Sequence, residues 1–334
     1  MSSTKTLEEL YSEHDGYASD KWGIYLTIYE RLFNSLKNAP VRLLEIGVQN
    51  GGSLAIWNKY FPQAERIIGC DINPACAQLA YDNDKTQVVI GDINHSDTQH
   101  KIFERCDEFD IIIDDGSHTS KDIIKTFSTL FPHIKQGGFY IVEDLHCSYW
   151  AKYQGGLYYP HSSMAFFKTL ADTLNFEHWG LPCSREQLLK PFGITAELNE
   201  ELIAEIHSVE FVNSMCILTR SPAEQNRLGR RHIAGRQELV CLIRQVDGTF
   251  SKAPPQQIGT LTETQPVLSQ ELEEVSELLQ ARLERKDQQI TALQEQVRTL
   301  EMAQHQAHEQ LLRAESQLEL LKELVLSGRR IEPL

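Results

Sequence analysis

Short apolar runs alternate with amphipathic segments between about residues 41 and 145. The runs are rich in Val, Ile and Leu, and they stand at residues 41–47, 66–72, 86–92, 109–116 and 137–145. Between them lie segments such as 53–61 and 120–131, in which apolar residues recur every three or four positions, the period of a helix. Nearly continuous apolar strands separated by helices predict a parallel sheet covered on both faces. The predicted fold class is therefore α/β.

Beyond this region the pattern changes twice. Runs at 208–212 and 214–220 are separated by one residue and predict an antiparallel hairpin at the sheet edge. The stretch that follows is basic at first, and its later prolines are typical of a linker. The predicted organisation is an N-terminal helical or lid segment (1–40), a sheet domain (41–221), a linker (222–266) and a long helix (267–327).

The last segment carries an unbroken heptad repeat. Position d falls on Leu272, Leu279, Lys286, Leu293, Leu300, Ala307, Ala314 and Leu321, and position a on Ser276, Leu283, Ile290, Val297, Gln304, Leu311, Leu318 and Val325. A sustained period of seven predicts a left-handed coiled coil, whereas a helix packed back on the domain would need a wider apolar stripe. β-branched Ile290 and Val297 at a favour two strands, and Leu at other a positions leaves three open. We expect a homo-oligomer, a dimer or a trimer.

Composition narrows the class of protein further. The 334 residues include 32 basic and 47 acidic ones, a net charge of −15, so general binding of nucleic acid is not expected. The chain has no membrane-spanning apolar run and begins without a signal peptide, which predicts a cytoplasmic protein. Seven scattered cysteines without a C-x-x-C pair argue against a disulfide framework and a thiolate zinc site.

Ligands of parallel sheets bind at the carboxyl ends of the strands, so the residues there matter most. A glycine-containing turn with Glu45, Gly47 and Gly51 follows the first strand, without the G-x-G-x-x-G fingerprint of dinucleotide sites. Asp71 ends the second strand, where a carboxylate can accept both ribose hydroxyls, and Asp92 ends the third, near an adenine amino group. Together these residues predict a pocket for S-adenosylmethionine, with Glu45 and Gly47 at the methionine end. For Asp71 a role as a turn or helix cap remains open.

The fourth and fifth strands end in carboxylates. Asp114 and Asp115 close the fourth strand, and Glu143 and Asp144 close the fifth. Four carboxylates on adjacent strand ends repel one another unless a counter-charge is present. All-oxygen ligation predicts a hard divalent cation, Mg²⁺ first and Mn²⁺ or Ca²⁺ after it. Each carboxylate alone could also be a strand-end cap.

His118 lies on the loop that leaves the fourth strand, beside this predicted metal pocket. An alcohol is a poor nucleophile at neutral pH, and a neighbouring imidazole can take its proton. His118 is therefore the candidate general base for methyl transfer to oxygen. His146, Tyr149 and Trp150 follow the carboxylates and are candidates for stacking on sugar rings, with ordinary core packing as the alternative.

From about residue 20 to 150 the chain resembles the metal-dependent sugar O-methyltransferases of macrolide biosynthesis, the macrocin and mycinamicin O-methyltransferase family. The shared motifs are SDKWG (19–23), the tyrosine and glutamate of IYERLF (28–33), LLEIGVQNGGSL (43–54), DDGSH (114–118), the LFP to GGFYIVEDL stretch (130–145) and SYW (148–150). The resemblance implies a class I methyltransferase fold. It also implies Asp115, Glu143 and Asp144 as Mg²⁺ ligands and His118 as base, which leaves Asp114 with the cofactor.

The sequence says less about the methyl acceptor than about the cofactor and the metal. Residues 151–205 match no motif of the family, and the coiled coil is similar only in kind to those of bacterial methyltransferases that cap surface polysaccharides. That analogy motivates a glycan acceptor and a glycosyltransferase partner. The basic cluster Arg227, Arg230, Arg231, His232 and Arg236 is expected to be a solvated helix face, with an acidic glycan or the inner face of a membrane as alternative contacts. Two further functions stay open, methylation of a non-sugar hydroxyl and a catalytically silent scaffold.

Overall fold

The structure is a computed structural model that describes residues 5–256 and 266–326. The chain divides into two compact units, residues 1–256 and 257–334. The first unit contains the sheet and the candidate site, and the second contains one long helix. Each unit is described by itself.

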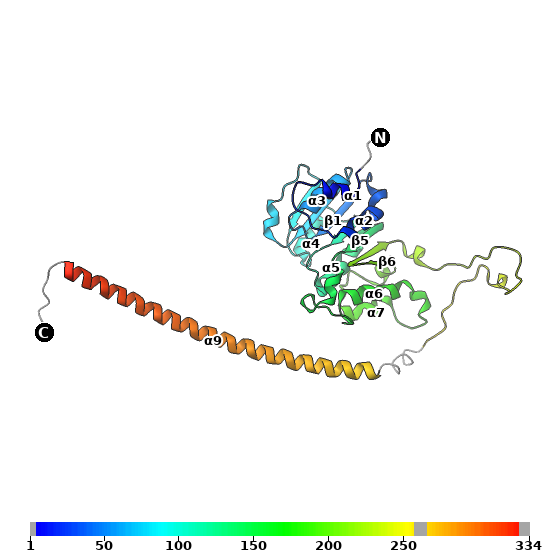
Figure 1. The fold of residues 1–334 in the computed structure, drawn as a ribbon. Coiled ribbons are helices and arrows are strands. Elements are labelled where there is room, and N and C mark those ends of the chain that lie inside the picture. Colours follow the sequence, from blue (N-terminus) through cyan, green and yellow to red (C-terminus); the bar gives the residue numbers. More distant parts are fainter. Residues whose placement is uncertain (1–4, 257–265, 327–334) are drawn as a thin grey trace. The chain divides into compact units, whose positions relative to one another are not determined.

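Seven strands form one mixed sheet in the first unit (Figure 1). They are β1 (Arg42–Ile46), β2 (Arg66–Asp71), β3 (Thr86–Ile90), β4 (Phe109–Asp114), β5 (Ile134–Val142), β6 (Ile206–Val212) and β7 (Met215–Arg220). The spatial order is β3-β2-β1-β4-β5-β7-β6, parallel from β3 to β5, with β7 antiparallel to both of its neighbours. The predicted α/β class, the parallel sheet and the antiparallel hairpin are confirmed. β5 begins three residues before the predicted run.

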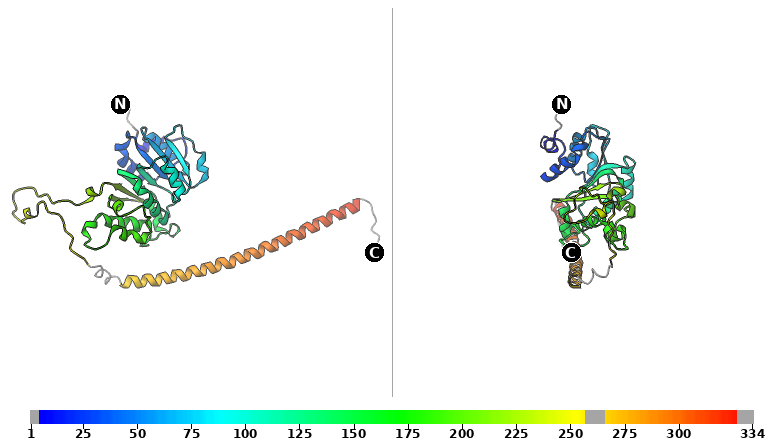
Figure 2. Two further views of the ribbon diagram at one scale, coloured as in Figure 1. Left: turned by 180° about the vertical axis from the view of Figure 1, so that it is seen from behind. Right: turned by 90° about the vertical axis from the view of Figure 1, so that its right-hand side faces the viewer.

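Helices cover both faces of this sheet, as the two views of Figure 2 show. The α-helices of the first unit are α1 (Leu7–Ser12), α2 (Gly23–Phe33), α3 (Gly52–Tyr60), α4 (Ser96–Phe103), α5 (Ser120–Leu130), α6 (Ser163–Leu174), α7 (Arg185–Leu189) and α8 (Glu200–Ile203). Along each strand the side chains alternate between two apolar cores. Leu43 packs with residues of α1, α2 and α3, whereas Leu44 packs with residues of α4, α5 and α6. Burial on both faces is the reason that these strands read as nearly continuous apolar runs.

The second unit is the helix α9 (Pro266–Leu326). Several heptad residues along it are more than half exposed, among them Ile290 (51%), Leu293 (59%) and Val297 (52%). The heptad assignments at Leu272, Ser276, Leu279, Leu283 and Val325 fall on side chains outside the described ones. Among the described residues, no helix is both long enough and apolar enough to cross a lipid bilayer.

The basic cluster of residues 227–236 does not lie on a helix. This stretch follows a short 3-10 helix, η8 (Ala223–Asn226), and has no regular secondary structure apart from an isolated bridge at Arg230. The expectation of a solvated helix face is therefore wrong. Gly229 and Gly235, both with positive φ, interrupt the helical pattern.

Candidate active site

Three strand ends are held in register where the candidate site lies. The Gly47 amide donates to the carbonyl of Cys70 (2.8 Å), the Asp115 amide donates to Ile46 (2.9 Å), and the Glu143 amide donates to Asp114 (2.9 Å). These hydrogen bonds continue the parallel ladder beyond the strands. The carboxyl ends of β1, β4 and β5 consequently present their side chains at one edge.

Asp114 and Asp115 point to different sides of that edge. Asp114 is buried and lines a cavity of about 220 Å³ together with Asp92. Burial raises the pKa of Asp114 to about 7, although the Gly116 N–H lowers it. Asp115 lines a second cavity of about 370 Å³. Successive residues of a strand face opposite ways, so Asp115 and not Asp114 lies beside Glu143 and Asp144. Those two residues follow the end of β5, and the positive φ of Asp144 interrupts the alternation there.

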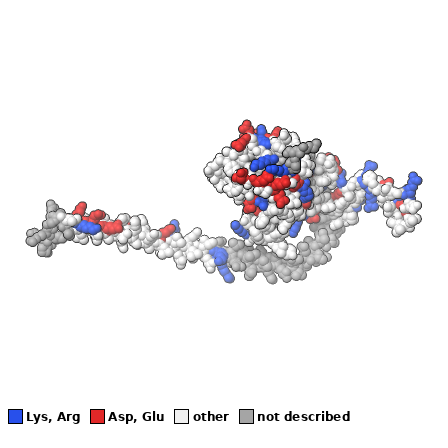
Figure 3. Space-filling model, turned by 45° about the horizontal axis from the view of Figure 1, so that its top comes forward, with Lys and Arg blue, Asp and Glu red and all other residues white. Residues whose placement is uncertain are grey.

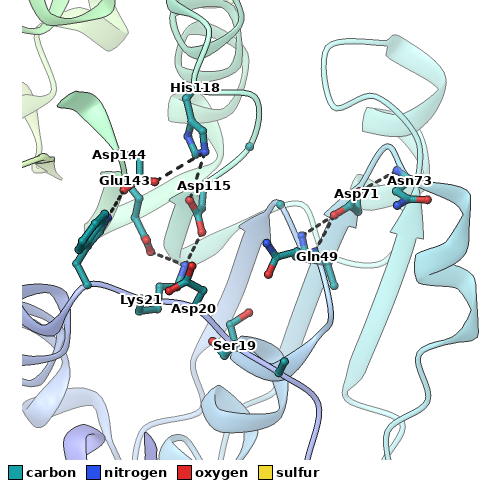
Figure 4. Close-up of a pocket in the computed structure, with 16 residues that line it drawn as sticks. Ser19, Asp20, Lys21, Gln49, Asp71, Asn73, Asp115, His118, Glu143 and Asp144 are labelled. Atoms are coloured by element: carbon teal, nitrogen blue, oxygen red, sulfur yellow. Dashed lines mark hydrogen bonds and ion pairs between the residues drawn. The ribbon is translucent and has the colours of Figure 1, made fainter. Parts of the chain in front are cut away.

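The three carboxylates predicted as metal ligands all line the larger cavity, and each has one oxygen already engaged (Figure 4). Oδ2 of Asp115 lies 2.6 Å from Nζ of Lys21, and Oε1 of Glu143 lies 2.8 Å from the same atom. Oδ1 of Asp144 accepts a hydrogen bond from Nε1 of Trp22 (3.0 Å). Within the described part of the chain, Oδ1 of Asp115, Oε2 of Glu143 and Oδ2 of Asp144 accept no hydrogen bond. Ligand atoms of Asp115, His118 and Asp144 lie within 4.8 Å of one another, and so do those of Glu45, Asp115 and Glu143. Carboxylate oxygens are the ligands that Mg²⁺ takes in proteins, so the chemistry of these groups fits a hard divalent ion, while the predicted set of Asp115, Glu143 and Asp144 remains a prediction.

Lys21 is the counter-charge of the site. Its side chain is 2% exposed, and its Nζ lies 3.3 Å from Glu45 as well as close to Asp115 and Glu143. Burial lowers the pKa of Lys21, but Glu143, Glu45 and Asp115 outweigh burial and hold it well above the ordinary value. Lys21 is therefore a buried ammonium. Burial raises the pKa of Glu143 to about 8, although Lys21 lowers it.

Helix α2 supports the same carboxylates from one face of the sheet. Tyr25 donates to Oδ1 of Asp144 (2.9 Å), and Tyr29 donates to Oε1 of Glu143. Asp144 has a positive φ of 51°, which is uncommon for a residue other than glycine. These contacts hold the backbone of Asp144 in that conformation and aim its second oxygen toward the cavity.

His118 faces the free oxygens of two of these carboxylates. Its Nε2 lies 4.0 Å from Oδ1 of Asp115 and 3.9 Å from Oδ2 of Asp144, as Figure 4 shows. The residue has a φ of 55°, which turns the imidazole back toward the strand ends. Its side chain is 22% exposed and lines the cavity, so an incoming hydroxyl can reach it.

The positions of Asp114 and Lys21 differ from the sequence-based prediction. It placed four carboxylates together without a counter-charge, but Asp114 turns away and Lys21 supplies one positive charge. Three carboxylates, those of Glu45, Asp115 and Glu143, still face this one ammonium, so a divalent cation would lower the remaining negative charge. The role of Lys21 was missed, because its partners lie between 24 and 122 residues further along the chain. The only available signal was its place in the SDKWG motif.

The two cavities described above meet at the glycine-containing turn after β1. Gly47, Asp71 and Gly116 line both of them. Oδ2 of Asp71 accepts the amides of Val48 (2.8 Å) and Gln49 (2.9 Å). Its Oδ1 accepts the amide of Asn73 (2.8 Å). The turn-capping role left open for Asp71 is thus present in the structure. The binding of ribose by this residue remains a prediction.

Two other predicted cofactor residues lie outside the lining of both cavities. Glu45 is fully buried, and its Oε2 accepts a hydrogen bond from Ser53 (2.8 Å). Gly51 precedes α3 with a φ of 82°, and a Cβ there would lie 2.6 Å from the Tyr81 hydroxyl. In the structure Glu45 acts through Lys21, and Gly51 allows the turn to pack.

The predicted aromatic residues do not line the larger cavity, but His146 contacts Trp22, which does line it. The ring of His146 lies 5.0 Å from that of Trp150 and 6.2 Å from that of Trp22. Tyr149 is 40% exposed and Trp150 is 50% exposed. Trp150 and Tyr149 are therefore not core residues, which removes the alternative interpretation for these two. Their contact with an acceptor remains a prediction.

Gly47 should tolerate no side chain, since it has a φ of 90° and a Cβ there would lie 2.1 Å from the Asp115 carbonyl oxygen. We expect Gly47→Ala to push the β1 and β4 loops apart and to weaken S-adenosylmethionine binding more than tenfold in calorimetry. Gly137→Ala is the matched control, because Gly137 has a φ of 83° and no atom within 4 Å of the added Cβ. Wild-type binding by Gly47→Ala would contradict this prediction, and equally weakened binding by both variants would point to backbone strain instead of the contact with Asp115.

The sheet order and the ligand edge define the class of protein: the first unit has the Rossmann-like fold of class I methyltransferases. A family model described as a methyltransferase domain matches residues 44–145. This range runs from β1 to the end of β5 and contains Asp115, His118 and the two acidic residues after β5. The predicted fold is confirmed.

The similar curated proteins have more specific names than the family model, and they are O-methyltransferases. The 8-demethyl-8-(2-methoxy-α-L-rhamnosyl)-tetracenomycin-C 3'-O-methyltransferase of Streptomyces olivaceus is 37% identical over 179 residues, which are 50% of this chain and 45% of that protein. The mycinamicin VI 2''-O-methyltransferase of Micromonospora griseorubida is 35% identical over 190 residues, 53% of this chain and 45% of that protein. The chain thus spans about half the length of the curated relatives it matches.

A solved methyltransferase structure is also similar to this chain. The MycE methyltransferase of the mycinamycin biosynthetic pathway, in complex with Mg, SAH and mycinamycin VI, matches with a TM-score of 0.53 and 25% identity. The match covers 66% of this chain and 56% of that one. The resemblance to sugar O-methyltransferases, stated above from the motifs, is confirmed.

Proposed function

We propose that the protein is an S-adenosylmethionine-dependent, Mg²⁺-dependent O-methyltransferase that acts on a sugar hydroxyl. One observation carries this proposal: the imidazole of His118 faces the free oxygens of Asp115 and Asp144 at the ligand edge of a methyltransferase domain. A base beside a hard-cation site is what the activation of an alcohol requires. The same set makes a silent scaffold a poor explanation.

The residues of the chain have distinct tasks in the proposed reaction. S-adenosylmethionine supplies a methyl group, whose bond to sulfur breaks as its bond to the acceptor oxygen forms. Asp115, Glu143 and Asp144 would hold Mg²⁺, which would supply positive charge to stabilise the developing alkoxide. Nε2 of His118 takes the hydroxyl proton, and the carboxylates of Asp115 and Asp144, about 4 Å away, stabilise the imidazolium. Lys21 keeps two of the ligands in place.

A sugar acceptor is supported by the relatives and by the exposed aromatic side chains at the mouth of the site. By their names, the relatives above methylate a rhamnosyl tetracenomycin at the 3'-oxygen and mycinamicin VI at the 2''-oxygen. Trp22 is 58% exposed and, with Tyr149 and Trp150, offers flat apolar faces of the kind that stack on sugar rings. The biological acceptor is a surface polysaccharide or a glycosylated natural product in this proposal, and a cytoplasmic location goes with it. Methylation of a non-sugar hydroxyl is the alternative.

Paired acceptors distinguish these functions. The full chain is incubated with S-adenosylmethionine, Mg²⁺ and either a set of rhamnosides or the corresponding aglycones, and S-adenosylhomocysteine is measured. We expect product with rhamnosides at a rate at least tenfold above that with aglycones. Faster methylation of the aglycones would favour the non-sugar alternative, and no product with any acceptor would contradict the proposal.

We also propose that α9 associates with α9 of a second or third copy as a coiled coil. The exposed heptad residues support this, because a stripe of large apolar side chains on a single helix is unstable in water. We expect Val297→Asp with Leu300→Asp, at positions a and d, to reduce the mass of the protein to that of one chain in light scattering. Ala292→Asp with Met302→Asp, at positions c and f, is the matched control and should leave the oligomer intact. A monomeric wild-type protein would contradict the coiled coil.

A further inference from the structure

Residues 227–252, which we call the basic arm, form a loop anchored to the domain at both ends. The amide of Leu228 donates to Oε1 of Glu177 (2.7 Å), and the amide of Gln256 donates to the carbonyl of Gly180 (2.9 Å). Both anchors lie on or just after the 3-10 helix η6 (Phe176–His178). Both ends of the arm are therefore held by one short segment of the domain, and Figures 1 and 2 show the arm extending away from the domain between these ends.

The arm has internal contacts that fix its shape. Arg230 and Phe250 form an antiparallel bridge, and the guanidinium of Arg230 lies 5.3 Å from the centroid of the Phe250 ring. Beyond this bridge the amide of Ile233 donates to Oδ1 of Asp247 (3.0 Å). At the far end, Oε1 of Glu238 accepts the amides of Ile243 (2.7 Å) and Arg244 (2.6 Å). The segment between Glu238 and Arg244 is thus closed into a tight loop.

That loop presents five apolar residues in succession, Leu239 to Ile243, to solvent. Leu239 is 87% exposed, Val240 is 100% exposed and Leu242 is 69% exposed. Cys241 between them is a free, exposed thiol. Grouped apolar exposure of this kind marks an interaction surface, whereas single exposed apolar residues are ordinary.

The arm also differs in charge from the rest of the chain. It contains six basic residues and two acidic ones, a net of +4 in a chain with a net charge of −15. The basic residues are Arg227, Arg230, Arg231, Arg236, Arg244 and Lys252, so they stand on both sides of the apolar loop. Figure 3 shows mainly blue side chains along this part of the molecule.

We propose that the basic arm docks the protein on an anionic lipid surface. Leu239, Val240 and Leu242 enter the boundary of the acyl chains, and the arginines beside them contact lipid phosphates. Charge complementarity selects this occupant. A soluble acidic polymer explains the arginines but not the apolar loop, and pairing of two arms brings like charges together. The proposal does not depend on the methyl-transfer reaction.

Vesicle sedimentation with the full chain tests this proposal. We expect the protein to bind phosphatidylcholine vesicles with 30 mol% phosphatidylglycerol at least tenfold more tightly than pure phosphatidylcholine vesicles, and to be released by 0.5 M salt. Val240→Asp with Leu242→Asp should lower this partition at least tenfold, as should Arg231→Glu with Arg236→Glu. A polarity-sensitive dye on Cys241 should shift its emission to the blue on the anionic vesicles alone.

Lys101→Glu with Arg105→Glu is the matched control, since it makes the same change of charge at two exposed residues, one on α4 and one just after it. This variant should bind the vesicles within twofold of the wild type. Calorimetry with S-adenosylmethionine on the arm variants checks that the domain is folded. Failure of the wild type to bind anionic vesicles, wild-type binding by the arm variants, or recruitment only through a protein partner would overturn the proposal.

Discussion

Replacement of His118 by asparagine is expected to lower the rate of methyl transfer by about 10²–10⁴-fold, the usual contribution of a general base. Asparagine is chosen because it tolerates the positive φ of this position better than alanine does. The acceptor hydroxyl then keeps its proton, while the strand ends and both cavities remain. Initial rates of S-adenosylhomocysteine formation, with saturating S-adenosylmethionine and Mg²⁺, give this effect directly.

The same preparation should bind S-adenosylmethionine within about twofold of the wild type in calorimetry, because His118 touches the acceptor side of the site. His100→Asn, on the exposed face of α4, is the matched control and should keep the wild-type rate. A His118→Asn variant with near wild-type turnover would refute the assignment of the base. A variant that loses cofactor affinity to the same extent would make His118 a structural residue.

Replacement of Lys21 by methionine should destabilise the first unit by about 3–5 kcal/mol, the cost of leaving buried charges without their partner. Methionine keeps the length and the apolar stem of lysine, so the main change is the loss of the ammonium among Glu45, Asp115 and Glu143. The melting temperature should fall by about 10 °C. Added Mg²⁺ should restore part of this loss, since the ion brings positive charge back to the same carboxylates.

Thermal unfolding followed by circular dichroism, with and without Mg²⁺, measures both effects. Lys59→Met is the matched control, because Lys59 is exposed on α3, and its melting temperature should stay within about 2 °C of the wild type. Equal melting temperatures for Lys21→Met and the wild type would show that the carboxylates do not need this ammonium. If Mg²⁺ raised the melting temperature of Lys21→Met and of the wild type by the same amount, Lys21 and the metal would not act on the same carboxylates.

The sheet could be predicted from the sequence because its strands are buried on both faces. Each strand of the first unit falls on an apolar run, and the short spacing between the last two runs was enough to predict the hairpin of β6 and β7. The arm of residues 227–252 was not predicted, because its arginines have near-helical spacing and glycine alone opposes a helix there. Its structure depends on contacts between distant residues, such as that of Arg230 with Phe250.

Only those site residues that follow the ends of strands could be predicted from the sequence. Parallel strands bring their carboxyl ends to one edge, so Asp115, His118 and Glu143 could be grouped without coordinates. Lys21 lies before the first strand, and nothing in its local sequence shows that it folds into the interior. Gly51 was grouped with the cofactor on its place in the turn, although packing against Tyr81 explains the glycine.

Titration of the full chain with Mn²⁺, followed by electron paramagnetic resonance, tests the central claim most directly, because it detects the divalent ion without an acceptor. We expect one Mn²⁺ per chain, displaced by Mg²⁺, and at least tenfold weaker binding by Asp144→Asn, with Asp97→Asn on α4 as the unchanged control. No Mn²⁺ binding at millimolar concentration, or equal affinity in Asp144→Asn and the wild type, would contradict a metal site at the ends of β4 and β5.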